Sequence, residues 1–419
     1  MLRSNESHSE LLIRPGGNDH QVVADLLAPG NTAGVGSRNR PLISRLVVDA
    51  HIASRRPAFS QIAGGAGIPY LVDPITPLLQ GELRPDDRWA ALPFGQSRAM
   101  EASDFEAQTA RDDLIAKTVD FQVEAGATAV IPPYVYASDT DDPWFHLSLD
   151  FLTRTASYMA TTGVRLPIFA VMCGQLHGFA LERVWSAGLD EFLQSALKVE
   201  AVSIGLCLSP AGSGKDSYHK VLRLFLAAHR AASAGVPVIA WRQGIYGPAL
   251  VAAGLAGYET GIGISEQTNI AASIWSRRPK ADGRRRSGGA IPGVFLEPLG
   301  RSVPAPVARA LLGDLRIRAK IMCDDETCCP LGPASTLDHS REHAIRSRAR
   351  GLQQLDEMPQ RTWRLHRVAR EARGAATLID QSNKTLRDLG YDRRLDATGA
   401  SSLAAVAEHL TESPLESVR

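Results

Sequence analysis

The stretch Ala201-Val-Ser-Ile-Gly-Leu-Cys207, followed after a helix-length segment by Pro237-Val-Ile-Ala-Trp241, decides the fold class. Short runs rich in Val and Ile that alternate with segments of helical periodicity are typical of a parallel α/β protein. The same alternation predicts strands at residues 46–49, 68–73, 127–132, 167–172, 201–207, 237–241, 258–264 and 317–323. Strands at this spacing predict a TIM-type (β/α)8 barrel, in which polar residues at the strand ends form the catalytic face.

The composition excludes a general attraction to nucleic acid or membrane. The 46 basic and 45 acidic residues give a net charge of +1, so any such attraction must be local. No apolar run is long enough to span a bilayer, and the N-terminus is polar, so we expect a cytoplasmic protein without a membrane partner.

The chain divides by composition into four parts. Residues 1–40 are rich in Gly, Asn and Ser and predict a flexible N-terminal arm, and residues 41–322 hold the barrel. Residues 323–395 combine the cysteines and histidines with an Arg- and Glu-rich helical pattern, and residues 396–419 read as a tail with a weak helix. We therefore expect a barrel with a C-terminal zinc-binding and helical subdomain.

Three of the five cysteines, Cys323, Cys328 and Cys329, lie within seven positions. His339, His343 and His366 follow them. Three thiolates and one imidazole form a plausible tetrahedral Zn²⁺ set, and two Cys with two His is a variant of it. We expect structural zinc; the alternative is a group of loop thiols without a function.

Two predicted strands end in ionisable side chains. Asp73 ends the run 68–73, where it could act as a general base or could cap the turn before Pro74. Asp49 and His51 are spaced i, i+2, so they could share a strand face. They could bind a metal, or they could form a hydrogen-bonded pair that closes the barrel, which we favour.

Basic residues crowd the loop 276–289, which has no apolar periodicity. Such a run can neutralise several phosphates of a nucleic acid, although Arg-rich loops are often merely solvated. The candidate phosphate contacts are Arg277, Arg278, Lys280, Arg284, Arg285 and Arg286. By contrast, the run 209–216 fails as a phosphate-binding loop, because Ser209 and Asp216 replace the required Gly and Ser or Thr.

Read in order, these segments resemble the tRNA-guanine transglycosylase superfamily, which includes enzymes that insert 7-deazaguanine bases into DNA. The matching segments are Leu71-Val-Asp73 through Gln80, Phe169-Ala-Val-Met-Cys173-Gly174, Ser203-Ile-Gly205-Leu206, the Gly-rich stretch 244–257, and Arg348 through Trp363-Arg-Leu-His366. The resemblance implies a barrel with a zinc subdomain near the last strand, a nucleic acid (tRNA or DNA) as partner and a possible homodimer.

The resemblance also implies roles for single residues. Asp73 would be the general base, and His366 would complete the zinc site with the three cysteines. The purine-binding segments would supply Cys173, Gly174, Gly205 and Leu206, and the following segment would add Trp241, Gln243, Gly244 and Tyr246. The chain departs from the family at the nucleophile, where Ile262 replaces the expected Asp, so Glu259 or Glu266 would have to act beside Asp73. Its cysteine spacing also differs.

These observations predict a nucleobase transglycosylase-like pentosyltransferase, in which a carboxylate attacks C1′ of a nucleotide and one base replaces another. Two alternatives remain open. One is a catalytically degenerate barrel that binds nucleic acid or a nucleotide. The other is a metal-dependent barrel hydrolase that uses Asp49, His51 and a later His or Asp, and it expects a second metal at the barrel mouth.

Overall fold

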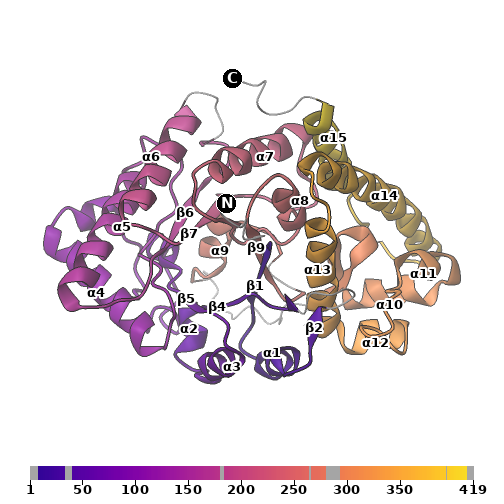
Figure 1. The fold of residues 1–419 in the computed structure, drawn as a ribbon, viewed down its shortest axis with the longest axis horizontal. Coiled ribbons are helices and arrows are strands. Elements are labelled where there is room, and N and C mark those ends of the chain that lie inside the picture. The colour runs from indigo at the N-terminus through magenta and orange to yellow at the C-terminus, as the bar shows by residue number, and fades with distance from the viewer. Residues whose placement is uncertain are drawn as a thin grey trace, which may run out of the picture.

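A parallel seven-stranded sheet forms the centre of the molecule (Figure 1). The computed structural model describes residues 8–33, 40–179, 184–263, 266–279, 293–392 and 394–412. The strand order is β5-β4-β1-β9-β8-β7-β6, and every pairing in this sheet is parallel. The strands are β1 (Glu10–Arg14), β4 (Arg45–Asp49), β5 (Tyr70–Asp73), β6 (Phe169–Gln175), β7 (Ser203–Ser209), β8 (Val238–Ala240) and β9 (Gly257–Gly261).

A short segment connects the two edges of this sheet. Ala129 forms a parallel bridge to Leu71 of β5, and Val130 forms another to Ile168, next to β6. The Thr128 amide donates to the Tyr70 carbonyl (2.8 Å), and the Phe169 amide donates to the Val130 carbonyl (2.8 Å). Residues 128–130 therefore lie between β5 and β6.

Helices alternate with these strands along the chain. They bury one apolar face each, as α7 does with Val221, Leu224 and Phe225 at the spacing of helical turns. The helices of this part are α1 (His20–Leu27), α2 (Ala50–Ala53), α3 (Ala58–Ala66), α4 (Gln108–Glu124), α5 (Pro143–Thr162), α6 (Val184–Lys198), α7 (Tyr218–Ala232), α8 (Gly247–Ala252) and α9 (Ile270–Ser276). Two 3₁₀ turns, η1 (Thr76–Gln80) and η2 (Ala102–Phe105), and a small pair, β2 (Thr32–Ala33) with β3 (Arg40–Pro41), complete it.

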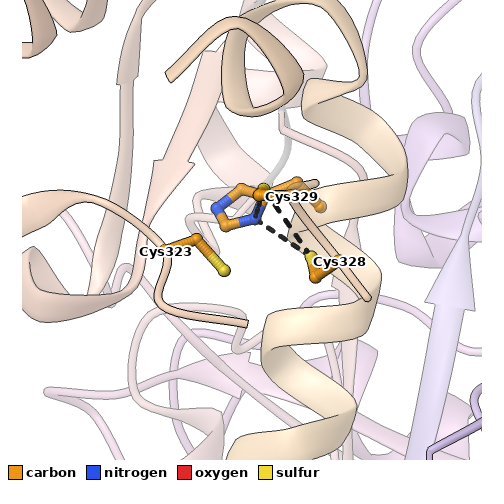
Figure 2. A group of neighbouring side chains, drawn as sticks. Cys323, Cys328 and Cys329 are labelled. Carbon is orange, nitrogen blue, oxygen red and sulfur yellow. Dashed lines mark hydrogen bonds between the residues drawn. The ribbon is translucent and has the colours of Figure 1, made fainter. Parts of the chain in front are cut away.

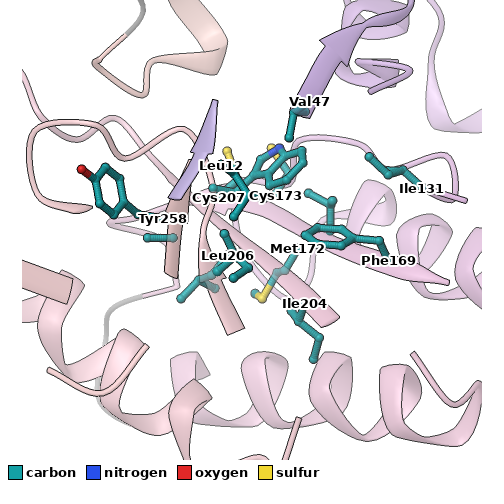
Figure 3. Close-up of a cluster of buried hydrophobic side chains, with 14 of the residues drawn as sticks. Leu12, Val47, Ile131, Phe169, Met172, Cys173, Ile204, Leu206, Cys207 and Tyr258 are labelled. Carbon is teal, nitrogen blue, oxygen red and sulfur yellow. The ribbon is translucent and has the colours of Figure 1, made fainter. Parts of the chain in front are cut away.

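The core beside the sheet is built from side chains of several strands (Figure 3). The Phe169 and Trp241 rings pack against each other there at an angle of 42°, with centroids 5.1 Å apart. A Cβ on Gly205 would lie 3.1 Å from the Phe169 ring and 3.2 Å from the Trp241 ring. Glycine at this position therefore makes room for two large rings.

The C-terminal part forms a second cluster on one side of the sheet, drawn in orange to yellow in Figure 1. Its hydrophobic centre includes Val294, Leu311 and Ile379. Helix α13 packs against β1 and α8, and α15 packs against α14 and α7. The elements are β10 (Gly293–Leu296), η3 (Glu297–Leu299), β11 (Arg301–Pro304), α10 (Ala305–Gly313), α11 (Leu315–Ile321), α12 (Pro333–Asp338), α13 (Ser340–Asp356), α14 (Arg361–Asp388) and α15 (Thr398–Glu412).

The structure confirms the α/β class and the parallel sheet, and it corrects three expectations. Residues 1–40 are not simply an arm, because they contain β1, which pairs with both β4 and β9. The expected strand 317–323 is mostly helix α11, whose N-terminus is capped by Asp314. The expected tail contains α15, with Val406 and Ala407 fully buried. None of the described helices is long and apolar enough to cross a membrane.

Candidate metal centre and charged cluster

Three sulfur atoms and one imidazole nitrogen converge beside the β10–β11 hairpin (Figure 2). Cys323 follows α11, Cys328 and Cys329 lie in the turn before α12, and His343 lies in α13. The Nδ1 atom of His343 is 3.4 Å from both Cys328 Sγ and Cys329 Sγ, which are 3.9 Å apart. All four ligand atoms lie within 4.8 Å of one another.

This geometry fits one tetrahedral ion. Zinc–sulfur bonds of about 2.3 Å and zinc–nitrogen bonds of about 2.0 Å place neighbouring ligand atoms about 3.5–3.8 Å apart at tetrahedral angles. The observed separations lie near these values. The four residues could therefore hold a metal ion with small movements of the side chains.

Hydrogen bonds around the cluster orient its ligands. His343 Nε2 lies 3.0 Å from the carbonyl oxygen of Phe295, so an N–H at Nε2 leaves the lone pair of Nδ1 facing the sulfurs. Thr336 Oγ1 lies 3.3 Å from Cys329 Sγ. The side chain of Asp325 accepts from the Cys328 amide (3.1 Å), which fixes the turn that carries both cysteines.

His366, which the family resemblance implied as the fourth ligand, is not in this cluster. It is exposed on α14, whereas His343 is buried with 2% exposure. The helical phase explains the difference, because the buried face of α14 carries Leu365, Val368 and Ala369 instead. The sequence offered both histidines, and only the packing of α13 against β10 selects His343.

A second group of charged side chains gathers at the carboxyl ends of β1, β4 and β5. Arg14 is the last residue of β1, and its guanidinium contacts three carboxylates. Nε donates to Glu259 (2.8 Å), Nη2 lies 2.9 Å from Asp73, and Nη1 donates to Asp49. We call Arg14, Asp49, Asp73, Arg242 and Glu259 the charged cluster.

Arg242 is the second cation of the charged cluster. Its side chain lies 3.2 Å from Asp73 and 3.5 Å from Asp49, and its amide donates to Glu259 Oε2 (2.9 Å). Its φ of +58° is in the left-handed region, which costs a non-glycine residue about 1–3 kcal/mol. Thr268 Oγ1 donates to the Arg242 carbonyl and helps to hold this conformation. Arg242 Nε is buried without a hydrogen-bond partner among the described residues.

Asp73 and Glu259 are saturated with donors. Asp73 is fully buried, and it accepts from the Tyr134 hydroxyl (2.8 Å) and the Ile75 amide (2.9 Å) in addition to the two guanidiniums. Glu259 is 1% exposed and takes two bonds from Arg14 and one from the Arg242 amide. These two carboxylates therefore have little capacity left for a substrate.

Asp49 and His51 are the more accessible members of this region. The Asp49 side chain is 17% exposed. Burial opposes its ionisation, but Arg14 and Arg242 outweigh this effect and lower the pKa of Asp49 to about 2. Burial lowers the pKa of His51 below its usual value, although Asp49 opposes that shift. His51 is therefore neutral at pH 7, and its Nδ1 has no hydrogen-bond partner among the described residues.

The structure brings two of the three predicted catalytic residues together. Asp73 and Glu259 share Arg14, but Glu266 does not join them. Glu266 instead pairs with Arg348 and accepts from the Ser302 amide (2.9 Å) on the C-terminal part. It is held by a buried ion pair away from the charged cluster, which corrects its expected place.

The predicted substrate-binding residues also separate. Trp241 adjoins the charged cluster, where the Arg14 guanidinium lies 5.2 Å from its ring, and Cys173 is buried in β6, where burial raises the pKa of its thiol well above the usual value. Gly174 makes room for the Phe179 ring and Gly244 for Thr260, and Leu206 is core. Gln243 donates to the Leu208 carbonyl (2.9 Å), and Tyr246 donates to Asp216 (3.0 Å).

The basic loop is described only in part. Arg277 pairs with Asp87 (2.9 Å), and Arg278 lies over the ring of Trp275, which is 63% exposed. Lys280, Arg284, Arg285 and Arg286 lie outside the described residues. Among the residues that the structure does describe, the cysteine cluster is the one group of His, Cys, Asp and Glu side chains with metal-site geometry. The second metal that a barrel hydrolase would need is not supported there.

Sequence reasoning assigned no role to either of the two arginines that organise the charged cluster. Arg14 follows the apolar run Leu11-Leu12-Ile13, which has the composition of a short strand. Arg242 directly follows the predicted strand 237–241. Arg14 and Arg242 both lie at the end of an apolar, strand-like run. An ionisable side chain at such a position is the same signal that marked Asp49 and Asp73 as candidates.

Comparison with known proteins does not assign the chain to a family. No family model matches it, and no curated protein matches it. Among solved structures it is similar to the carboxyl transferase domain of Rhizobium etli pyruvate carboxylase with 3-bromopyruvate, at 12% identity and a TM-score of 0.37, over 98% of this chain and 61% of that chain. A Rhizobium etli pyruvate carboxylase T882A structure gives 14% identity and a TM-score of 0.37, over 97% and 36%. The chain thus spans less than two thirds of either protein, and TM-scores this low support no functional inference.

Proposed function

We propose that this protein is a barrel enzyme whose reaction centre is the charged cluster. One observation carries the proposal: carboxylates from β4, β5 and β9 meet two guanidiniums where parallel strands end. Burying five charged side chains costs free energy, and proteins in which hydrophobic residues replace buried ion pairs are often equally stable. Stability alone therefore does not explain this cluster. Catalytic residues of barrel enzymes usually lie at the carboxyl ends of the strands, which is where these charged groups lie.

The barrel itself is part of this proposal. Residues 128–130 form a β-bridge to β5 on one side, and on the other side they form a β-bridge to Ile168, which directly precedes β6. We take this segment as the eighth parallel member, which would close the sheet into a (β/α)8 barrel. The C-terminal part then acts as a subdomain beside it.

The reaction that we propose is nucleobase exchange at C1′ of a nucleotide, as the resemblance to transglycosylases implies. Asp49 is the ionised and accessible carboxylate, so its oxygen would form a bond to C1′ while the bond from C1′ to the base nitrogen breaks. The departing base would take up a proton from solvent, and neutral His51 would act as the general base that removes the proton of the incoming base. Asp73 and Glu259 would act as positioning residues that hold Arg14 and Arg242.

A nucleic acid is the proposed partner. Trp275 is exposed beside Arg278, and such a pair can stack on a base and neutralise a phosphate. Helix α9, which carries Trp275, contacts η1 directly after β5, so this surface lies at the same end of the sheet as the charged cluster.

The metal in the cysteine cluster is proposed to be Zn²⁺ in a structural role. Three sulfur ligands and one nitrogen ligand fill all four tetrahedral positions, which leaves none for a substrate. Zinc would tie α11, the turn before α12 and α13 to one another.

Base exchange can be measured directly. Labelled guanine or 7-deazaguanine is offered with tRNA and with DNA to the full chain, to Asp49→Asn and to Asp190→Asn. Asp190 pairs with Arg230 on exposed helices and serves as the control. We expect Asp49→Asn to lower the rate by at least ~100-fold and Asp190→Asn to leave it unchanged. The proposal fails if wild-type protein exchanges no base, or if Asp49→Asn is as fast as wild type.

A second candidate is a barrel that binds nucleic acid without chemistry. The saturation of Asp73 and Glu259 by donors favours it. Retained binding of an oligonucleotide by wild-type protein, without exchange or cleavage, would select this candidate.

A further inference from the structure

A large cavity lies between β9 and α8 on one side and part of the C-terminal helices on the other. Its volume is about 940 Å³, and its walls come from α8, η3, β11, α11, α13, α14 and α15. Tyr258 of β9 lines it, whereas the next residue, Glu259, joins the charged cluster. Because successive strand residues point to opposite faces, the cavity lies on the other side of β9 from the proposed reaction centre.

Cations outnumber carboxylates on the cavity wall. The carboxylates are Glu297, Asp324 and Glu371, and each pairs with an arginine of the same wall. The cations are Arg301, Lys320, Arg348, Arg350, Arg367, Arg370 and Arg373. Arg348 also pairs with Glu266 and Arg373 with Glu408, so the wall cations without a carboxylate partner among the described residues are Arg301, Lys320 and Arg370.

Two of these cations are held by neutral acceptors. Arg301 donates to the carbonyl oxygen of Asp396, and Lys320 donates to the side-chain oxygen of Gln381 (2.7 Å). Burial lowers the pKa of Arg301, which reflects a guanidinium partly removed from water. A bound anion would compensate for that lost hydration.

Two glycines line the cavity from within helices. Gly351 in α13 and Gly374 in α14 both line it, and an added Cβ would meet nothing within 4 Å at either position. A glycine inside a helix costs about 0.5–1 kcal/mol relative to alanine. Alanine would leave the cavity open at either position, whereas a longer side chain could enter it.

The cavity wall also contains polar atoms without partners. Ser347 Oγ and Arg348 Nε have no hydrogen-bond partner among the described residues, although both residues are at most 4% exposed. Buried polar atoms normally find a partner, so a ligand or water is expected beside them.

We propose that this cavity binds a phosphate-bearing organic anion of about the size of a nucleotide. Guanidinium groups offer planar pairs of donors that match phosphate oxygens. Ile245, Pro248 and Leu355 supply apolar wall for the organic part, and the volume lies in the range of small-molecule sites. The site is separate from the charged cluster and does not depend on the proposed exchange reaction.

The test is a titration of the zinc-loaded full chain with ATP and with inorganic pyrophosphate, followed by calorimetry and by the melting temperature. Gly374→Leu fills the cavity from a helix position that favours leucine over glycine, and Arg301→Gln removes a cation. We expect saturable ATP binding that weakens at least ~10-fold in each variant. Gly374→Ala, which adds one methyl group, is the matched control and should keep binding.

The two probes separate the sources of recognition. Binding of ATP well above that of pyrophosphate, lost in Gly374→Leu, supports an organic phosphate ligand. No saturable binding of either probe would overturn the proposal, as would ATP binding that is unchanged in both Gly374→Leu and Arg301→Gln. The melting temperature of Gly374→Leu without ligand is the folding control. If it equals or exceeds that of wild type, this variant is folded, and its loss of ATP binding is not caused by unfolding.

Discussion

At the scale of single residues, the three carboxylates of the charged cluster differ in how far they are buried and in how many donors surround them. Asp73 and Glu259 are completely enclosed by donors, while Asp49 keeps an accessible edge. The sequence reading treated Asp73 as the first catalytic candidate because it ends a strand. Its four hydrogen-bonding and ionic contacts instead favour a role in holding the two guanidiniums.

Asp73→Asn should destabilise the protein by about 3–5 kcal/mol, because it leaves Arg14 and Arg242 buried with less negative charge. Urea unfolding measures this change. Asp190→Asn, which breaks an exposed pair, should cost at most about 1 kcal/mol. Equal effects of both substitutions would contradict the structural weight given to Asp73.

The ionisation of Asp49 makes stability depend on acid pH. Its pKa falls from 3.8 to about 2 on folding, so its contribution of about 2 kcal/mol is fully present above pH 4. The contribution is lost as the pH falls from 4 to 2. The free energy of unfolding of wild type and Asp49→Asn, measured across this range, should converge at the acid end. A constant difference would show that Asp49 is not stabilised as an anion.

At the scale of elements, β7 shows how a glycine can be required by packing rather than by a ligand. The family resemblance gave Gly205 a purine contact, but its Cα faces the rings of Phe169 and Trp241. Both rings are fully buried, so neither can move aside easily.

Gly205→Ala should therefore destabilise the protein by about 1–3 kcal/mol through overpacking. Thermal unfolding checks this value. Gly374→Ala is the matched comparison, because its added methyl group meets open space inside α14 and should stabilise the helix by about 0.5–1 kcal/mol. Opposite signs for the two substitutions are the expected result.

At the scale of the whole molecule, the cysteine cluster brings together α11, the turn before α12 and α13, with its four residues between positions 323 and 343. Cys323 follows α11, and His343 lies in α13, which packs against β1 and α8. A metal at this place would link the C-terminal part to the sheet through α13. Loss of the metal should thus lower the stability of the C-terminal part more than that of the sheet.

Zinc content tests the ligand set. We expect one Zn²⁺ per chain in wild type, loss of the metal in Cys328→Ser and His343→Asn, and full retention in the matched variant His366→Asn, because His366 is exposed on α14. The melting temperature should fall with a strong chelator and in the first two variants. Retained zinc in His343→Asn, or its loss in His366→Asn, would refute this ligand set.

The sequence alone determined the α/β class, six of the seven strands of the parallel sheet and the three cysteines of the candidate metal site, because apolar runs and clustered thiols are local signals. It missed β1, whose five residues lie among Gly, Asn and Ser, and it assigned a strand to the capped helix α11. Tertiary structure decided which histidine joins the cysteines and which carboxylates meet Arg14. Those choices depend on which face of a helix or strand turns inward and on contacts between residues up to 245 positions apart, such as Arg14 with Glu259. No local pattern records such a contact.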